Sequence, residues 1–466
     1  MLRLLAALPF LAACLIFVER DASAPLTVGI AEVDVTPKLA KDKPVYLAGF
    51  GKDRKATGTN DPIMARAVVL QHGKTKIALV SVDVVGLFLP FVEGVRKQLP
   101  GFAHVVVSST HNHEGPDTLG LWGAGIFTSG IDKAYMKRLT KGIVDAVEKA
   151  DAARVPVTAK INTVQVPELL HDNRLPIVKH DDLVVLTFED AKKKPAGIVV
   201  QWNCHPETLS SKNTLLSADY VGYTVKHLRD KYHCGVVYLT GTVGGLMTSL
   251  KVPIRSETGV DLKDGTYEKT ARYGVLLGQA AARAIDKAKP VTLTPFVVRT
   301  RKLYLPLANP AYVSARQFGV LDREAFHWKG DPDKADAMAD LETDKPLAMR
   351  TELGYLRLGD LDIACIPGEI YPEIVLDKVQ TPADPGADFP DAPAEPAIYK
   401  QLAGPHRMMI GLANDEIGYI IPKRQWDAKP PFAYKRKAAQ YGEINSLGPE
   451  TAPILCKAFA ELVKGK

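Results

Sequence analysis

Short apolar runs alternate with longer amphipathic stretches along this chain, and this alternation constrains the fold more than any other feature. Apolar runs rich in β-formers predict strands, and apolar residues spaced three and four apart predict helices. The predicted strands span residues 27–35, 75–83, 103–109, 182–188, 196–203, 235–240, 361–366 and 407–413. The clearest predicted helices span residues 132–150 and 267–288. The pattern indicates an α/β fold in which helices flank stacked or mixed β-sheets.

The first residues have the features of an export signal. Arg3 precedes an apolar run over residues 4–18 that is short for a transmembrane helix, and Ala22-Ser23-Ala24 offers a small-residue cleavage site. Leu11-Ala12-Ala13-Cys14 also has the form of a bacterial lipobox, so lipid anchoring at Cys14 is the alternative. We interpret residues 1–24 as a signal peptide and expect an exported protein, located in the periplasm, at the cell surface or outside the cell.

The remaining residues, 25–466, show no clean boundary and are predicted to form one large domain. Residues 381–396 are rich in proline, aspartate and alanine, which predicts an exposed, mobile insertion. The formal net charge is only +6 over 466 residues, without a basic run interleaved with aromatics, so we expect no nucleic-acid partner. The mild positive charge leaves open a peripheral contact with a membrane surface, and nothing in the pattern points to an oligomeric state.

Potential metal ligands follow the predicted strands at the points where the strands end. Five such side chains follow four different strands: His111, His113, His205, Glu369 and Tyr419. Because loops at the carboxyl ends of neighbouring strands gather at one edge of a sheet, residues far apart in sequence can converge there. Histidines one residue apart in an extended segment face the same way, so both can reach one ion. Taken singly, each residue also has a structural interpretation, such as a helix start at Glu369 or a core aromatic at Tyr419.

Asp83 ends another of these apolar runs. Its carboxylate is a candidate for orienting a histidine of the site, and capping of a following helix is the alternative.

Several ordered motifs together resemble the neutral/alkaline non-lysosomal ceramidases: VGIAEVDVTP, SSTHNHEGP, WNCHPETL, IPGE and ANDEIGYIIPKRQW. The resemblance implies a Zn²⁺ ion held by the three histidines and Glu369, with Tyr419 as a further ligand or as a hydrogen-bond donor. It implies hydrolysis of the amide bond of a ceramide-like N-acyl lipid by a metal-activated water. Asn173-Arg174 matches a family segment, so Arg174 is expected to bind substrate.

The chain departs from the family pattern in two places. Gly244, in the loop from Thr242 to Gly245, stands where the family has a serine, and we expect the backbone amides of this loop to act on the substrate instead. The chain stops near residue 466, so we expect the family's C-terminal immunoglobulin-like domain to be missing. The alternatives are a zinc amidase or esterase for another exported substrate, such as an N-acyl amino compound or sugar, and a metal-holding binding protein without activity.

Overall fold

The computed structural model describes residues 24–334, 338–339 and 345–466. The predicted signal peptide therefore lies outside the described residues, apart from Ala24. None of the helices in the described ranges combines the length and the apolar character needed to cross a membrane.

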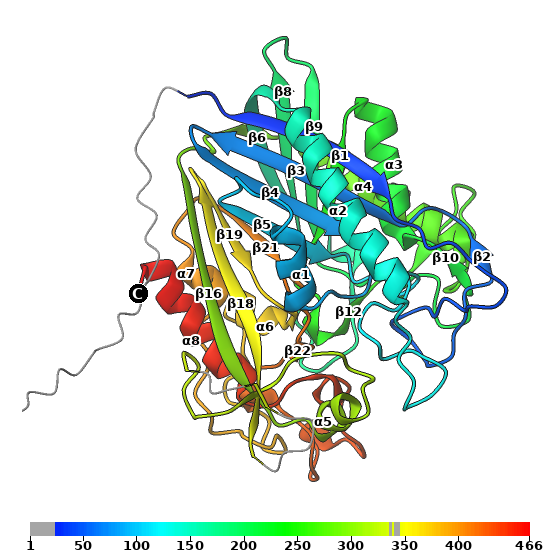
Figure 1. Ribbon diagram of the computed structural model, residues 1–466, viewed down its shortest axis with the longest axis vertical. Helices are drawn as coiled ribbons and strands as arrows, with labels where there is room; N and C mark the ends of the chain where they lie inside the picture. The colour runs from blue at the N-terminus through cyan, green and yellow to red at the C-terminus, as the bar shows by residue number, and fades with distance from the viewer. Residues whose placement is uncertain (1–23, 335–337, 340–344) are drawn as a thin grey trace, which may run out of the picture.

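A large mixed sheet is built by the N-terminal part of the chain (Figure 1). Its strands are β1 (Thr27–Asp34), β3 (Met64–His72), β4 (Thr75–Val82), β5 (His104–Ser109), β6 (Val155–Gln165), β8 (Asp182–Asp190), β9 (Pro195–Trp202), β11 (Val236–Thr240) and β15 (Lys289–Val291). The order across the sheet is β11-β9-β8-β6-β1-β3-β4-β5, with β15 paired to β6. The pairs at the two ends, β4 with β5 and β9 with β11, are parallel, and the other pairs are antiparallel. The edge strand β11 also contacts β3, β4 and β5, which shows that the sheet is strongly curved.

A second sheet stacks against the first. It consists of β16 (Phe296–Leu307), β17 (Phe326–His327), β18 (Leu347–Leu358), β19 (Leu361–Cys365) and β21 (His406–Ile410). A buried apolar cluster fills the space between the sheets, with Leu79, Leu186 and Leu239 from the first sheet and Leu356 and Ile363 from the second. Burial of this apolar surface is the main favourable contribution to folding. The predicted α/β fold with stacked sheets is confirmed.

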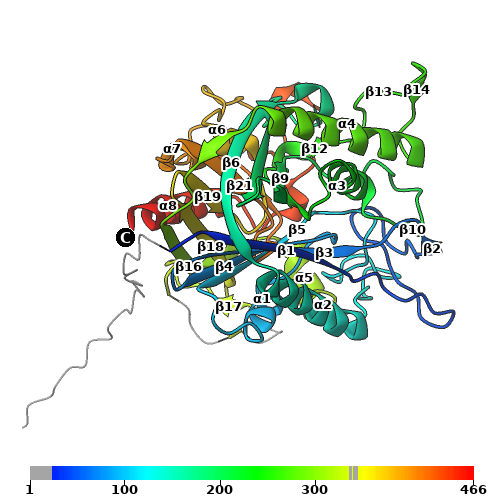
Figure 2. The same ribbon diagram turned by 90° about the horizontal axis from the view of Figure 1, so that it is seen from above.

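Helices cover the outer faces of both sheets (Figures 1 and 2). The helices of the described ranges are α1 (Leu89–Arg96), α2 (Lys133–Ala152), α3 (Asp219–Tyr232), α4 (Tyr267–Asp286), α5 (Pro310–Gln317), α6 (Pro372–Leu376), α7 (Ile398–Gln401) and α8 (Thr451–Lys464), of which α5 lies among the loops at the bottom of Figure 1. The first sheet is covered by α1 and α2 over one half and by α3 and α4 over the other, and α8 packs on the second sheet. The two predicted helices correspond to α2 and α4, which begin at the capping side chains of Asp132 and Thr266.

The segment 381–396 contains neither helix nor strand. Two of its side chains are nevertheless buried, Ala387 and Glu395. The amide of Lys423 donates to the Glu395 carboxylate at 2.8 Å, which holds this part of the segment against the body of the protein. Exposure is therefore confined to part of the segment, and its mobility stays a prediction.

Backbone and side-chain hydrogen bonds join the two sheets beside β5. The Val107 amide donates to Oδ1 of Asn414 at 2.9 Å, and the Asn414 amide donates to the Val107 carbonyl at 2.7 Å. Nδ2 of Asn414 donates to Glu352 on β18 at 3.1 Å. Asn414 has a φ of +67°, a left-handed conformation that asparagine tolerates better than most residues. Asn414 therefore links β5 to the chain that follows β21.

We predict that Asn414→Ala lowers the free energy of unfolding by about 1–3 kcal/mol, because it leaves the buried Val107 amide without an acceptor. Denaturant unfolding followed by circular dichroism measures the change. The exposed Asn60 is the control, since Asn60→Ala should stay within about 0.5 kcal/mol of the unchanged protein. Equal stability of the two variants would show that the junction does not depend on this side chain.

Candidate functional site

The residues that follow the ends of four strands converge on one buried site, as the sequence predicts. His111 lies just after β5 with a φ of +64°, and His205 lies just after β9. Glu369 and Tyr419 begin two short strands, β20 (Glu369–Ile370) and β22 (Tyr419–Ile420), which pair in parallel with these residues in register. The first sheet thus supplies the imidazoles, and the chain beyond the second sheet supplies the carboxylate and the phenol.

The orientation of two imidazoles is fixed by backbone carbonyls. Nδ1 of His111 lies 2.7 Å from the carbonyl oxygen of Val85, and Nδ1 of His205 lies 2.7 Å from that of Met247. Because a carbonyl oxygen can only accept a hydrogen bond, each Nδ1 carries a hydrogen, and in the neutral ring each Nε2 is left with its lone pair.

Both of these Nε2 atoms face the same carboxylate oxygen. Oε2 of Glu369 lies 3.3 Å from Nε2 of His111 and 3.0 Å from Nε2 of His205. Lone pairs that face one another at such distances need a cation between them, either a proton or a metal ion. The geometry therefore creates a position for positive charge between the two rings and Glu369.

His113 completes the group of three imidazoles but has a different partner. Its Nδ1 lies 3.3 Å from Oε2 of Glu207. Its ring lies against Gly49, where a Cβ would come within 2.2 Å of the imidazole, and Gly49 has a φ of +91°. Only glycine combines that close approach with that backbone conformation without strain.

The pKa values of these buried groups reflect their mutual contacts. Burial alone would raise the pKa of Glu369, but His111 and His205 outweigh it and hold the pKa below its usual value. Burial likewise opposes ionisation of Glu207, yet His113 and His205 bring its pKa to about 2. Burial lowers the pKa of His113 to about 4 despite Glu207. Ionised carboxylates beside a neutral imidazole are the protonation states that metal ligands require.

The site fits a metal ion such as zinc. Potential ligand atoms of His111, His113 and His205 all lie within 4.8 Å of one another, and all three residues are buried. Imidazole nitrogens with one carboxylate form a donor set that zinc accepts readily.

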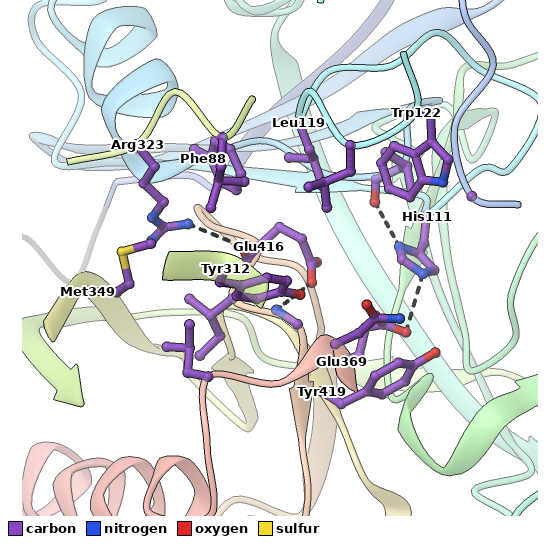
Figure 3. A pocket seen from close by; sticks show the side chains of 18 of the residues that line it. Phe88, His111, Leu119, Trp122, Tyr312, Arg323, Met349, Glu369, Glu416 and Tyr419 are labelled. Atoms are coloured by element: carbon purple, nitrogen blue, oxygen red, sulfur yellow. Dashed lines mark hydrogen bonds and ion pairs between the residues drawn. The ribbon is translucent and has the colours of Figure 1, made fainter. Parts of the chain in front are cut away.

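An apolar pocket of about 90 Å³ opens beside these residues (Figure 3). Its wall includes His111, His113, Glu369 and Tyr419 together with apolar side chains, among them Phe88, Leu119, Trp122, Leu321 and Met349. Figure 3 shows the Tyr419 ring beside Glu369. Burial, followed by the charge of Glu369, raises the pKa of Tyr419 well above its usual value, so the phenol keeps its proton.

Gly244 and Arg174 lie outside this pocket wall. Gly244 packs behind the carboxylate strand, where a Cβ would lie 2.5 Å from the carbonyl oxygens of Glu369 and Ile370. Arg174 is buried and binds both carboxylate oxygens of Glu443, at 2.6 and 2.9 Å, and the Tyr441 carbonyl at 2.7 Å. The missing side chain of Gly244 thus lets the loop pack directly against the backbone of Glu369. Arg174 holds the segment that carries Tyr441, a residue of the pocket wall.

The predicted roles of Asp83 are wrong. Both of its carboxylate oxygens accept from Nη1 of Arg66, at 2.8 and 2.7 Å, and one also accepts from the Met64 amide. Carbonyl groups orient His111 and His205 instead.

Sequence reasoning missed Glu207 and Glu416. Glu207 lies in the quoted motif WNCHPETL, two residues after His205, and this spacing was the available signal. Glu416 lies three residues before Tyr419 in the motif ANDEIGYIIPKRQW, and this position inside the motif was the available signal.

We predict that Gly244→Ser lowers the free energy of unfolding by about 1–3 kcal/mol, because the added atoms overpack the backbone of Glu369 and Ile370. Thermal and denaturant unfolding measure the loss. Gly51→Ser is the matched control, since no atom lies within 4 Å of a Cβ built at Gly51. A Gly244→Ser protein as stable as its Gly51→Ser counterpart would show that this loop has room for a serine.

Comparisons with known proteins point to one family. The sequence model described as "Neutral/alkaline non-lysosomal ceramidase, N-terminal" matches residues 26–238. The neutral ceramidase of Pseudomonas aeruginosa is 24% identical in an alignment of 229 residues that covers 44% of this chain and 33% of that protein. The sequence match thus spans only about a third of the relative's length.

Solved structures extend the likeness to nearly the whole chain. The crystal structure of neutral ceramidase from Pseudomonas aeruginosa has a TM-score of 0.71 at 16% identity, covering 94% of this chain and 74% of that one. A structure described as "Ceramidase complexed with C2" has a TM-score of 0.69 at 16% identity, covering 94% and 75%. These two comparisons show a shared fold. The resemblance predicted from the motifs is confirmed: residues 26–238 match the sequence model of the neutral/alkaline non-lysosomal ceramidases.

Proposed function

We propose that this protein is a zinc-dependent amidohydrolase that cleaves the amide bond of a ceramide-like N-acyl lipid. The observation that carries the proposal is the pair of imidazole lone pairs facing the Glu369 carboxylate at 3.0 and 3.3 Å in the wall of an apolar pocket. The name of the relative, neutral ceramidase, supports the substrate class.

His111, His205 and Glu369 would hold the ion, with His113 as the third imidazole and Tyr419 as a further ligand or a hydrogen-bond donor. A bound zinc supplies Lewis acidity, which activates water and polarises a carbonyl group. The carbonyls of Val85 and Met247 keep two imidazoles in the tautomer that a ligand needs. These contacts support a site arranged before the substrate arrives.

The remaining groups of the pocket would bind and orient the substrate. Apolar side chains such as Phe88 and Leu119 would pack against a hydrocarbon chain of the substrate and exclude water. The phenol of Tyr419 keeps its proton and can donate a hydrogen bond to the carbonyl oxygen as negative charge develops there. Arg174 acts indirectly in this proposal, by holding the Tyr441 segment.

Exposed apolar side chains lie close in sequence to residues of the pocket wall, and they favour a lipid substrate over a sugar. Phe127 and Phe318 are 61% and 59% exposed, and their ring centroids lie 4.7 Å apart. Tyr441, in the pocket wall, is 51% exposed, and Ile444, next to the wall residue Asn445, is 64% exposed. Aromatic side chains of this kind partition into the interface of a membrane. We therefore include a peripheral membrane contact in the proposal.

We predict one tightly bound zinc ion per chain. His111→Ala and His205→Ala should each lose the metal together with hydrolysis of N-acyl substrates, because each removes a ligand. Elemental analysis of protein purified without added metal gives the stoichiometry. His72→Ala is the control, because this buried histidine lies at the end of β3 that is remote from the metal site.

Sub-stoichiometric zinc that cannot be reconstituted would reject the metal site. Full zinc without hydrolysis of any N-acyl amide or ester would instead favour the inactive binding protein.

We predict that Tyr419→Phe lowers kcat by about 10²–10³-fold, the usual effect of removing a donor to a developing oxyanion, and changes stability little. Steady-state kinetics and thermal unfolding are measured on the same preparations. Tyr238→Phe provides the contrast, because the Tyr238 hydroxyl lies 3.0 Å from that of Tyr220 in a buried core. That variant should lose stability and keep its turnover. Unchanged turnover in Tyr419→Phe would remove the phenol from the mechanism.

A further inference from the structure

A buried glutamate in the pocket wall has no part in the proposed hydrolysis. Glu416 is 7% exposed and lines the same pocket as His111 and Glu369. Figure 3 shows it between Arg323 and Glu369, beside Tyr312. A carboxyl group in a largely apolar wall is costly unless it is hydrogen-bonded, so its presence calls for a partner.

Only half of this carboxyl group is satisfied by the protein. Oε1 accepts from the Gly418 amide at 2.8 Å. Oε2 is buried, and no group in the described part of the chain forms a hydrogen bond with it. The side chain is held in place, because Gly86 packs so closely on it that a Cβ there would lie 2.8 Å from Cγ of Glu416.

The neighbouring arginine is already committed to other partners. Nη2 of Arg323 pairs with Oδ2 of Asp415 at 2.5 Å, and Nη1 donates to the carbonyl oxygen of Glu416 at 3.1 Å. Glu416 is therefore not the counterion of a structural pair. Burial, followed by the charges of Glu369 and Asp415, raises the pKa of Glu416 well above its usual value.

A hydroxyl group is the ligand that suits this position in either protonation state. It can accept from a protonated carboxyl group and donate to an ionised one. A plain hydrocarbon would enclose Oε2 without a partner, and the lost hydrogen bond corresponds to about a 5- to 100-fold weaker interaction.

We propose that Glu416 is a specificity-determining residue: its buried Oε2 binds a hydroxyl group of the substrate inside the pocket, so that Glu416 sets the ratio of activity between a hydroxylated amide and its deoxy analogue. This inference rests on the proposed function, since it names the substrate class of the same site.

The experiment compares two matched pairs of amides with the full-length protein. In one pair the hydroxyl is on the amine side, as in an N-acylethanolamine beside the N-acylpropylamine of equal length. In the other pair it is on the acyl side, as in an α-hydroxyacyl amide beside the plain acyl amide. The quantity measured is the ratio of kcat/KM within each pair, for the unchanged protein, Glu416→Met and Glu416→Gln.

We expect the unchanged protein to prefer the hydroxylated member of at least one pair by about tenfold or more. Glu416→Met should bring this ratio to about one, and Glu416→Gln, which still donates and accepts, should retain much of it. Glu373→Met is the matched control. Glu373 is another buried glutamate with an unpartnered Oε2 among the described residues, and it lies outside the pocket wall, so its replacement should leave the ratio unchanged.

Either of two results would overturn the inference: no preference in the unchanged protein for either pair, or a preference that survives in Glu416→Met. The first result does not depend on the folding of a variant. Hydrolysis of a ceramide tests the proposed function separately. If none of the four amides is hydrolysed, calorimetric binding of the same pairs tests Glu416. Tighter binding of the hydroxylated amide that is lost in Glu416→Met would support the inference without turnover.

Discussion

The hydrogen bonds between Val107 and Asn414 are the contact on which the site depends. They fix the end of β5 relative to the chain that follows β21, so that the ends of strands from two different sheets meet. His111 lies four residues after Val107, and Tyr419 lies five residues after Asn414. Such short tethers give each side chain little freedom to move relative to the other. The imidazoles of one sheet and the carboxylate beyond the other are therefore held in one rigid frame.

Three residues at this junction have left-handed backbone conformations, which residues other than glycine adopt rarely. His111, Leu412 and Asn414 have φ values of +64°, +45° and +67°, although none is a glycine. Such conformations cost free energy and persist only where the surrounding structure enforces them. Here the enforcing contacts are the Val85 carbonyl on the His111 ring and the backbone pairing of Asn414 with Val107. Packing of the two sheets thus supplies the free energy that shapes the site.

Much of this arrangement was predictable because the site residues directly follow apolar runs. The ends of β5, β9, β19 and β21 are visible in the sequence, and with them His111, His205, Glu369 and Tyr419. The orienting groups were not predictable, because the carbonyls of Val85 and Met247 carry no side-chain signal. Asp83 was a candidate for orienting a histidine or capping a helix, but the unforeseen pairing of β3 with β4 places Arg66 next to it. Periodicity predicted the strands but not their partners, so stacked and mixed sheets stayed alternatives until the structure was known.

The carboxylates of the site require positive charge nearby, and the side chains of the described chain supply only part of it. Glu369 is buried and the Glu207 side chain is 13% exposed, and their ion-pair partners in the described chain are histidines. Burial favours the uncharged form of His205, yet its hydrogen bond to Glu369 raises its pKa, so positive charge is drawn to this contact. A proton there neutralises one carboxylate, whereas a divalent ion can neutralise both and accept the lone pairs of all three imidazoles. The arrangement of acids and imidazoles therefore favours a metal ion over protons as the source of the missing positive charge.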